Sequence, residues 1–589
     1  MTVAADMQDG LFEPVDDFFA RAMLDISGET DPIVAQVLRL VSAAARSGNV
    51  CIQVADETVL RRLGTEVQPV AVLEAVWGAL RQSQLVGDGS RETPLVMDDS
   101  GRVYLHRFWQ TQQRLAYRIV EKGVHPQTIV DTANPVERAV ALAGQSDFLV
   151  ITGGPGAGKT TLVATVLASL IALRSDIRMM ACAPSGKAAV RLREALARSR
   201  VSPHLLSRYP APVVDRLPVD VSTIHRLLSP VAGTNRFRYS RERQLPVDVL
   251  VVDEASMVDL HLMSALFDAV PRRAKVILLG DQYQLSSIEP GRILGDICYG
   301  AVIRKLRKDA PFKNETLAEC IVTLDGSYRF SPDSGIGQLA AAVNAGDAKL
   351  AERLVTDSVS AEIEYVNLRH PDARIKMASL METLFTPGMQ ATTAEEKLRC
   401  YEASRILCAV NHGPFGVQGL NRMAEVQLEN RGFIRPGDAM THHELSSGLL
   451  YGSKPIIIPK NDYSVSLFNG DTGVICQERD RLLACFWGSD GAIRKLPVSA
   501  LRSHFPAFAT TIHKAQGSEF DHVVVVLPET KSPLLSRELL YTAVTRARKK
   551  LTIFAAPGVI QHCVSHPTRR AFALGHQLWG VEAEDIDIV

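Results

Sequence analysis

The sequence predicts an α/β protein with two parallel-sheet cores, and three observations support this fold class. Short apolar runs of strand length alternate with helical stretches from about residue 145, and the alternation returns between about residues 405 and 527. Each run ends in a polar or glycine-bearing loop, as ligand-binding loops do at the carboxyl ends of parallel strands. Of the 589 residues, 46% are hydrophobic, so the chain can bury several packed interiors.

Composition excludes several classes of protein. Lys and Arg number 65, as do Asp and Glu, which excludes a polycation but allows a local basic channel. The 9 cysteines form no CxxC pair, so zinc ribbons are excluded. Apolar runs such as Val523–Leu527 are too short to cross a membrane, and the acidic first residues lack a signal-peptide core. We therefore expect a cytoplasmic protein with no membrane partner.

The chain divides into five segments. Residues 1–110 are predicted to form a helical N-terminal partner-docking domain, because Pro32–Ser47 and Val70–Gln84 have apolar residues at helical spacing. The first core is expected over 111–320, and the second over 321–430 and 505–560. Residues 431–504 contain short strands broken by Asn-Asp and Asn-Gly-Asp turns, which predict a small β-barrel inserted into the second core, before a C-terminal tail at 561–589. The expected core strands are Phe148–Thr152, Met179–Ala183, Val247–Val252, Lys275–Leu279, Arg405–Val410 and Val523–Leu527.

A phosphate-binding loop follows the first expected strand. The residues GGPGAGKT from 153 to 160 fit GxxxxGK[ST], and TLVATVLA then opens a helix. Backbone N–H groups of such a loop surround phosphate oxygens, while Lys159 reaches the β and γ phosphates and Thr160 ligates Mg²⁺. The alternative, a chance glycine-rich turn, does not explain the flanking strand and helix. The candidate nucleotide-binding residues are Gly153, Gly154, Pro155, Gly156, Ala157, Gly158, Lys159, Thr160 and Thr161.

Two further expected strands end in residues that suit phosphate hydrolysis. Asp253 and Glu254 follow Val247–Val252, where Asp253 can hold the metal and Glu254 can polarise the attacking water. Gln284, in GDQYQL after Lys275–Leu279, can hydrogen-bond the γ-phosphate or that water. The alternative for each is an ordinary solvated turn, which the upstream phosphate loop makes less favourable.

A nucleotide-driven motor needs cations from a second body to sense the γ-phosphate. Two arginines far downstream are candidates for that role. Arg329 lies in GSYRF, and Arg546 lies in YTAVTRAR, in a short helical stretch after Val523–Leu527. An isolated arginine is more often a solvated surface residue, so their positions relative to Lys159 decide the hypothesis.

The ordered motifs resemble those of superfamily 1 helicases of the 5′→3′ branch. They read GGPGAGKTT, APSGKAAVRL, STIHRLL, VVDEASMVD, GDQYQL, SYRF, TTIHKAQGSEF and YTAVTRAR. The phrases IEPGRILGDIC, GPFGVQGLN and NDYSVSLFNGDTGVI narrow the resemblance to the RecD family, the α subunits of RecBCD enzymes (exodeoxyribonuclease V). The resemblance covers most of residues 125–555.

The resemblance implies two RecA-like P-loop cores, ATP and Mg²⁺ as cofactors, and a single DNA strand from a duplex end as substrate. It implies β and γ partner subunits of a heterotrimer, and the 5′→3′ direction comes from the resemblance alone. The implied catalytic residues are Lys159, Glu254, Gln284, Arg329 and Arg546, with Thr160 and Asp253 at the metal. The implied strand-binding residues are Ser185, Lys187, Thr223, His225, Thr511, His513 and Lys514.

The strand-binding residues are chemically suited to phosphates. Hydroxyls can donate to phosphate oxygens, and Lys187 is followed by Arg191 and Arg193 on one expected helix. The alternatives are that the hydroxyls cap helices or turns, and that the histidines are buried. One departure from the family concerns the adenine-reading glutamine, because Val136 or Glu137 occupies its place.

Two other functions are compatible with parts of the sequence. A stand-alone RecD-like helicase would carry a longer N-terminal region than the roughly 110 residues here. A nucleotide-gated scaffold would not need Lys159, Asp253, Glu254 and Arg546 together. No clustered acidic set outside the ATP site predicts a nuclease centre, so any nuclease activity is expected in a partner.

Overall fold

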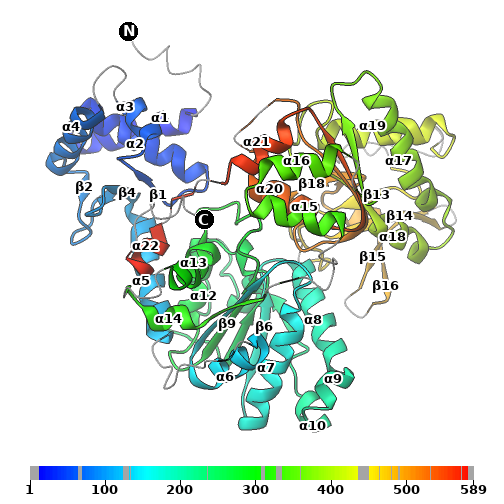
Figure 1. Cartoon of the computed structure of the whole chain (residues 1–589), viewed down its shortest axis with the longest axis horizontal. Helices are drawn as coiled ribbons and strands as arrows, with labels where there is room; N and C mark the ends of the chain where they lie inside the picture. Colours follow the sequence, from blue (N-terminus) through cyan, green and yellow to red (C-terminus); the bar gives the residue numbers. More distant parts are fainter. Residues whose placement is uncertain are drawn as a thin grey trace.

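The computed structural model describes residues 12–63, 69–123, 132, 134–234, 236–306, 312–324, 326, 334–357, 360–434, 450–462, 464–478, 481–488, 491–530, 532, 534–568, 570–571 and 573–580. In the view of Figure 1 the N-terminal region lies at the upper left, the first core at the bottom and the second core at the upper right. The inserted sheet lies on the outer side of the second core. Across these residues, no helix has the length and apolar character needed to cross a membrane.

The N-terminal region is a mixed α/β unit. Its sheet has the order β1-β4-β3-β2, from β1 (Cys51–Gln53), β2 (Val86–Gly87), β3 (Leu95–Met97) and β4 (Arg102–Leu105). The predicted helical character is confirmed by the helices of this region, but the prediction did not include the sheet, because strands of two to four residues are too short for an alternating pattern. The helices are α1 (Pro14–Ser27), α2 (Pro32–Arg46), α3 (Glu57–Leu63), α4 (Pro69–Gln82) and α5 (His106–Lys122), which continues onto the first core.

The first core is a six-stranded sheet in which every pairing is parallel, with the order β10-β5-β9-β8-β6-β7. The fully buried strands β5, β8 and β9 are mostly apolar, as expected for a parallel sheet covered on both faces. The carboxyl ends of β5, β8 and β9 lie side by side, which brings the phosphate loop, the acidic pair and the glutamine segment to one edge. The strands are β5 (Phe148–Gly153), β6 (Met179–Ala183), β7 (Val221–Thr223), β8 (Val249–Val252), β9 (Lys275–Gly280) and β10 (Ile321–Leu324).

Helices cover both faces of this sheet (Figure 1). Helix α7 is buried along nearly its whole length, and α8 begins where β6 ends. The helical elements are α6 (Pro135–Gln145), α7 (Lys159–Leu173), α8 (Gly186–Arg200), α9 (Pro203–Leu206), α10 (Ala211–Val214), α11 (Ile224–Leu228), η2 (Ala255–Met257), α12 (Leu260–Ala269), α13 (Ile293–Leu306) and α14 (Glu315–Glu319).

The second core is a parallel five-stranded sheet with the order β11-β20-β19-β12-β18. Its strands are β11 (Ile363–Asn367), β12 (Ser404–Cys408), β18 (Ala509–Thr511), β19 (Phe520–Val526) and β20 (Ala547–Ala555). Its helical elements are α15 (Gly335–Asn344), α16 (Ala348–Thr356), α17 (Ala373–Gln390), α18 (Ala394–Ala403), α19 (Val417–Asn430), η4 (His513–Ala515), α20 (Arg537–Val544) and α21 (Val559–Ser565). Two α/β cores with parallel sheets, as the sequence predicts, are therefore present.

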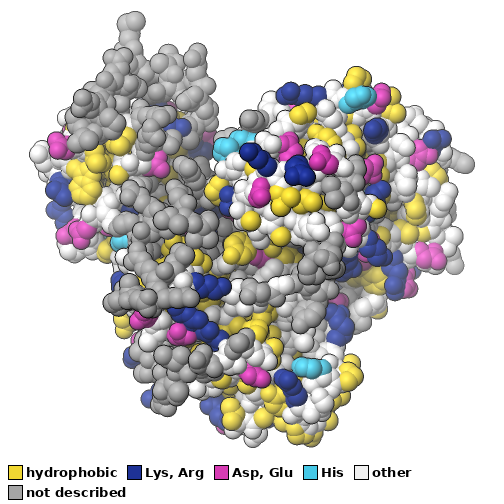
Figure 2. Space-filling view, in the orientation of Figure 1, with side chains coloured by type: hydrophobic (Ala, Val, Ile, Leu, Met, Phe, Trp, Pro, Cys, Tyr) yellow, Lys and Arg dark blue, Asp and Glu magenta, His cyan; other side chains and the backbone are white. Residues whose placement is uncertain are grey.

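An antiparallel sheet of the order β16-β15-β14-β13-β17 is inserted between β12 and β18. Across the described residues β16 and β17 are not paired with each other, so the sheet is open there and the predicted barrel is not confirmed. Basic side chains gather over β15 and β16 (Figure 2). The elements are β13 (Pro455–Ile457), β14 (Thr472–Glu478), β15 (Arg481–Trp487), β16 (Ile493–Pro497), η3 (Val498–Ala500) and β17 (Phe505–Pro506).

After the second core the chain returns to the first. Helix α22 (Ala573–Trp579) packs beside α5 and α13 (Figure 1). The Trp579 indole is buried and donates to the Asp296 carbonyl at 2.7 Å. Within the segment expected to be a C-terminal tail, residues 573–579 are thus an integral part of the first core.

Candidate functional site

The phosphate loop joins β5 to α7. Gly156 and Gly158 have φ of 78° and 85°, in the left-handed region where glycine is favoured. The Lys159 ammonium lies across the loop and donates to the carbonyls of Gly153 at 2.6 Å and Gly154 at 3.0 Å. The structure therefore places Lys159 and the first N–H groups of α7 around one concave loop, where phosphate oxygens can bind.

The acidic pair lies beside this loop, at the end of β8. The Glu254 N–H donates to the Asp253 carboxylate at 2.8 Å, and Glu254 has φ of 51°, which is uncommon for a residue with a side chain. Burial raises the pKa of the Asp253 carboxyl, Glu254 adds to that rise, and Lys159 opposes it. A buried carboxylate with excess negative charge beside it favours a bound cation.

Oxygen donors at this position suit magnesium. The Thr160 hydroxyl and the Asp253 carboxylate are hard ligands, and Mg²⁺ commonly combines one or two such groups with substrate phosphates. In the part of the chain that the structure describes, no group of three or more His, Cys, Asp or Glu side chains could hold a metal without such phosphates. The donor set therefore fits a metal that arrives with a nucleotide.

The glutamine segment contacts the second core through Asp281, to which Gln284 is also hydrogen-bonded. The Gln284 amide donates to Asp281 Oδ2 at 3.0 Å, and the Tyr541 hydroxyl of α20 donates to the same oxygen at 3.1 Å. Burial raises the pKa of both Asp281 and Tyr541. A Cβ added to Gly154 would lie 3.3 Å from the Tyr541 hydroxyl, so this contact between the cores lies directly against the phosphate loop.

Two more hydrogen bonds join the cores at the next residues. The Leu285 N–H donates to the Thr542 hydroxyl at 3.0 Å, and the Gln516 amide donates to the Leu285 carbonyl at 2.8 Å. Both partners belong to the second core, in α20 and in the turn after η4. The segment 281–285 is therefore held by the second core through side chain and backbone alike.

Arg546 is buried rather than directed into solvent. Its Nε donates to the Thr542 carbonyl at 3.1 Å and its Nη1 to the Ser518 carbonyl at 3.2 Å. It lies in the turn between α20 and β20, not within a helix as predicted, because α20 ends at Val544. Arg329 lies outside the described residues. Of the two arginines predicted for the γ-phosphate, Arg546 thus directly follows α20, the helix that carries Tyr541, and both of these hydrogen bonds lie within the second core.

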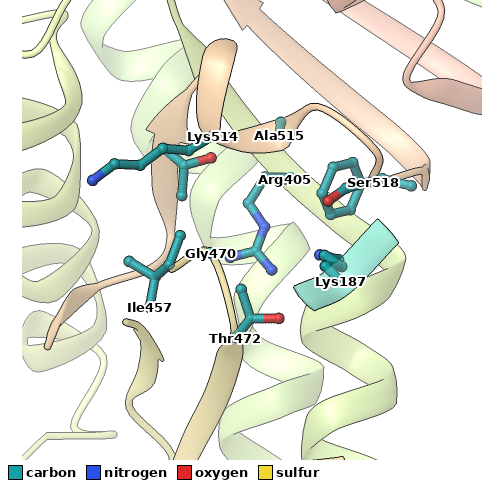
Figure 3. A pocket seen from close by; sticks show the side chains of 10 residues that line it. Lys187, Arg405, Ile457, Gly470, Thr472, Lys514, Ala515 and Ser518 are labelled. Atoms are coloured by element: carbon teal, nitrogen blue, oxygen red, sulfur yellow. The ribbon is translucent and has the colours of Figure 1, made fainter. Parts of the chain in front are cut away.

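Three cations from both cores surround a small pocket under the inserted sheet (Figure 3). Lys187 comes from the first turn of α8, Arg405 from β12 and Lys514 from η4. Burial lowers the pKa of Lys187 to about 7, and Arg191 and Arg405 contribute to that shift. An anionic phosphate beside Lys187 and Arg405 would favour the charged form of Lys187.

The predicted hydroxyls cap local structure. Ser185 accepts from the Ala188 N–H at 3.3 Å, Thr223 from the Arg226 N–H at 3.2 Å, and Thr511 from the Lys514 N–H at 3.3 Å. A hydroxyl that accepts still carries a proton that can be donated to a phosphate. Capping therefore does not exclude a strand contact at these positions.

The two predicted histidines are partly buried. Burial lowers the pKa of His225 and of His513, so both are neutral near pH 7. The His225 ring meets the Phe237 ring edge-on, with centroids 5.9 Å apart. Neutral imidazoles can hydrogen-bond to a strand but add no charge to the pocket.

Comparisons with known proteins match all three regions of the chain. Family models for the RecBCD enzyme subunit RecD N-terminal domain, an AAA domain and a UvrD-like helicase C-terminal domain match residues 8–104, 136–290 and 506–554. The chain is 32% identical over 592 residues to the RecBCD enzyme subunit RecD of Mycobacterium tuberculosis (strain CDC 1551 / Oshkosh), covering 98% of this chain and 96% of that protein. The chain belongs to the RecD family.

Other relatives are similar over less of their length. The RecBCD enzyme subunit RecD of Haemophilus influenzae is 31% identical over 531 residues, which cover 81% of this chain and 80% of that protein. The ATP-dependent RecD2 DNA helicase of Deinococcus radiodurans is 31% identical over 413 residues, which cover 69% of this chain but 47% of that protein. The similarity to the Mycobacterium tuberculosis RecD subunit thus extends over nearly the whole chain, whereas the similarity to the RecD2 helicase covers 69% of this chain and about half of that protein.

Three residues of this RecD-family site were not predicted as site residues from the sequence. Asp281 and Tyr541 stand inside motifs, but their shared hydrogen bond depends on how two cores meet. Arg405 is the second residue of β12, and its guanidinium donates to the carbonyls of Ala507 and, at 3.2 Å, Tyr401. Only the helicase motifs themselves could have directed attention to Asp281 and Tyr541, and nothing in the sequence singles out Arg405.

Proposed function

We propose that this chain is the ATP-driven DNA helicase subunit of a RecBCD-type helicase–nuclease, moving 5′→3′ along one strand during double-strand break repair and homologous recombination in the cytoplasm. The observation that carries the proposal is the contact of the Tyr541 hydroxyl with Asp281 beside the phosphate loop. Two α/β cores that meet against one phosphate loop are what an ATP-driven translocase requires. The direction of movement rests on membership of the RecD family.

ATP hydrolysis would use residues of both cores. Lys159 would bind the β and γ phosphates in place of the Gly153 and Gly154 carbonyls, and Thr160 with Asp253 would hold Mg²⁺, which neutralises phosphate charge. Glu254 would accept a proton from the attacking water. Arg546, and Arg329 by its motif, would donate to the γ-phosphate from the second core. Loss of that phosphate would remove their shared anion and release the cores from each other.

Strand movement would follow from alternating grip. Lys187 belongs to the first core, whereas Arg405 and Lys514 belong to the second, and all three line the same pocket (Figure 3). When the cleft closes and opens, the two sets of cations move relative to each other along the strand phosphates. A duplex is too wide for a single-strand path, so its complementary strand is displaced.

The heterotrimeric assembly is favoured over a stand-alone helicase. The RecBCD enzyme subunit RecD of Mycobacterium tuberculosis aligns with 98% of this chain, whereas the RecD2 helicase of Deinococcus radiodurans aligns with 69% of it. An exposed apolar stripe on α1 offers a docking face for β and γ subunits, because Val15, Phe18 and Ile26 are 50%, 73% and 81% exposed. Nuclease activity would then reside in a partner.

Two measurements test this function. Lys159→Ala should abolish single-strand-stimulated ATP hydrolysis in the full chain, and the wild-type complex should unwind duplexes with 5′ tails in preference to 3′ tails. Retained strand-stimulated hydrolysis in the Lys159→Ala variant would contradict the ATP site. Absence of large co-purifying partners, together with unwinding by the chain alone, would favour the stand-alone helicase.

A further inference from the structure

Helix α8 connects the strand pocket to the ATP cleft. Lys187 lies in its first turn and lines the pocket, and Arg191 follows four residues later, on the same face one turn along. The Arg191 Nη1 atom lies 3.7 Å from Glu519 Oε1 of the second core. One helical turn of the first core thus touches both the strand pocket and the opposite core.

Glu519 is tied to the segment that carries Arg546. Its other carboxylate oxygen, Oε2, accepts from Nε and Nη2 of Arg548 at 3.1 and 2.8 Å. The preceding residue, Ser518, offers the carbonyl that accepts from Arg546 Nη1 at 3.2 Å. A displacement of Glu519 would therefore also displace the segment that contains Arg546.

The charges around Arg191 belong to the ATP cleft. Burial lowers the pKa of Arg191, Glu519 and Glu254 oppose that shift, and Arg546 contributes to it. The guanidinium therefore feels the water-polarising acid of one core and the arginine of the other. From its position shortly after Lys187 in the sequence, Arg191 was expected in the strand track. Its charged neighbours differ from those of the strand track.

We propose that Arg191 is a positioning residue that couples strand binding at Lys187 to the seating of Arg546 over the ATP site. This inference rests on the proposed helicase function. Lys187 and Arg191 lie one turn apart on the same face of α8, so a contact that holds one of them also sets the position of the other. A strand phosphate at Lys187 holds the first turn of α8 in place, which keeps Arg191 next to Glu519 and thereby positions the Ser518 carbonyl that accepts from Arg546.

The first test separates ATP turnover from strand affinity. Arg191→Gln in the full chain is compared with Arg198→Gln, a matched control on the same helix whose side chain is 73% exposed. ATP hydrolysis is measured against oligo(dT) concentration. We expect the maximal strand-stimulated turnover of Arg191→Gln to fall by about tenfold, with half-saturating oligo(dT) within about twofold of wild type. The Arg198→Gln control should match wild type in both quantities.

Two further variants test the route through Glu519. Glu519→Gln should reproduce most of the Arg191→Gln loss, and the double variant should be no slower than the slower single variant, because both remove one link. Arg191→Lys should retain most turnover, because the 3.7 Å ion pair depends on charge rather than on guanidinium geometry. Losses that multiply in the double variant would overturn the route.

Other outcomes distinguish this inference from the function on which it rests. A parallel loss of turnover and oligo(dT) affinity in Arg191→Gln would return Arg191 to the strand track and overturn the coupling role. Turnover equal to that of Arg198→Gln would also overturn it. A wild-type protein without strand-stimulated hydrolysis would instead refute the helicase function.

Discussion

Removing the hydrogen bond between Tyr541 and Asp281 tests how strongly this contact holds the two cores together. Tyr541→Phe keeps the buried ring and removes only the hydroxyl that donates to Asp281 Oδ2 at 3.1 Å. The carboxylate keeps the Gln284 amide at 3.0 Å and the Tyr283 N–H at 3.0 Å, so one of three donors is lost. A hydrogen bond to a charged group contributes about 2 kcal/mol, which corresponds to a roughly 30-fold shift between the joined and separated cores.

That shift should appear in catalysis. If closure of the cleft limits turnover, strand-stimulated kcat for ATP should fall by about 10- to 30-fold in Tyr541→Phe, because Arg546 lies on the same side of the interface. Steady-state hydrolysis at saturating oligo(dT) measures this change, and thermal unfolding checks that the variant is folded. The matched control is Tyr283→Phe, since Tyr283 is 46% exposed and adjoins the same segment.

The opposite result is equally informative. Wild-type kcat and wild-type thermal stability in Tyr541→Phe would mean that this hydrogen bond does not hold the cores together during turnover. The contacts of Leu285 with Thr542 and Gln516 would then be sufficient, and the reasoning from the shared Asp281 oxygen would be refuted.

Three other predictions follow from single residues. Glu254→Gln should lower kcat for ATP by about 100-fold or more while nucleotide binding, measured by fluorescent-nucleotide titration, persists; near-normal turnover would exclude Glu254 as the base. Phe18→Asp should weaken co-purification with partner subunits by about tenfold or more, because the side chain is 73% exposed on α1, whereas Val201→Asp on the first core, 75% exposed, should not. Burial, aided by Lys454, lowers the pKa of His504 to about 4 from 6.5. The unfolded chain then takes up the proton first, so stability should decline as pH falls from 6.5 toward 4, by on the order of 3 kcal/mol for this group. Denaturant unfolding at pH 7.5 and 5 should show a smaller difference for His504→Gln than for wild type, and an equal difference would contradict the assignment.

The parts of the site that were predictable are those built from adjacent residues. The phosphate loop is contiguous, so β5 at Phe148–Gly153 and α7 from Lys159 lie where GGPGAGKT places them. Strand β6 has the predicted bounds Met179–Ala183, because a buried parallel strand is a continuous apolar run. Adjacent residues were therefore enough to predict where the phosphate loop lies in the fold.

The rest depends on where distant segments meet. Arg405 stands in no motif, and Glu519 stands inside TTIHKAQGSEF without a predicted role. Their surroundings come from the other core, because Arg405 lines one pocket with Lys187 and Glu519 lies 3.7 Å from Arg191. Arg191 is the clearest case. Its neighbours in the sequence suggest the strand track, whereas its neighbours in space belong to the ATP cleft.

The return of α22 to the first core has a mechanical consequence. The chain leaves the first core after β10 and comes back at α22, so the second core is tethered at two points. The returning segment is fastened by Arg570, whose Nη1 donates to the Gly291 carbonyl at 2.8 Å, and by the Ala571 N–H, which donates to Asn49 at 3.1 Å. A body tied at two points can turn about the line between them but cannot drift away. The second core would therefore rotate about the same axis in every opening and closing of the cleft, even when no nucleotide connects the two cores.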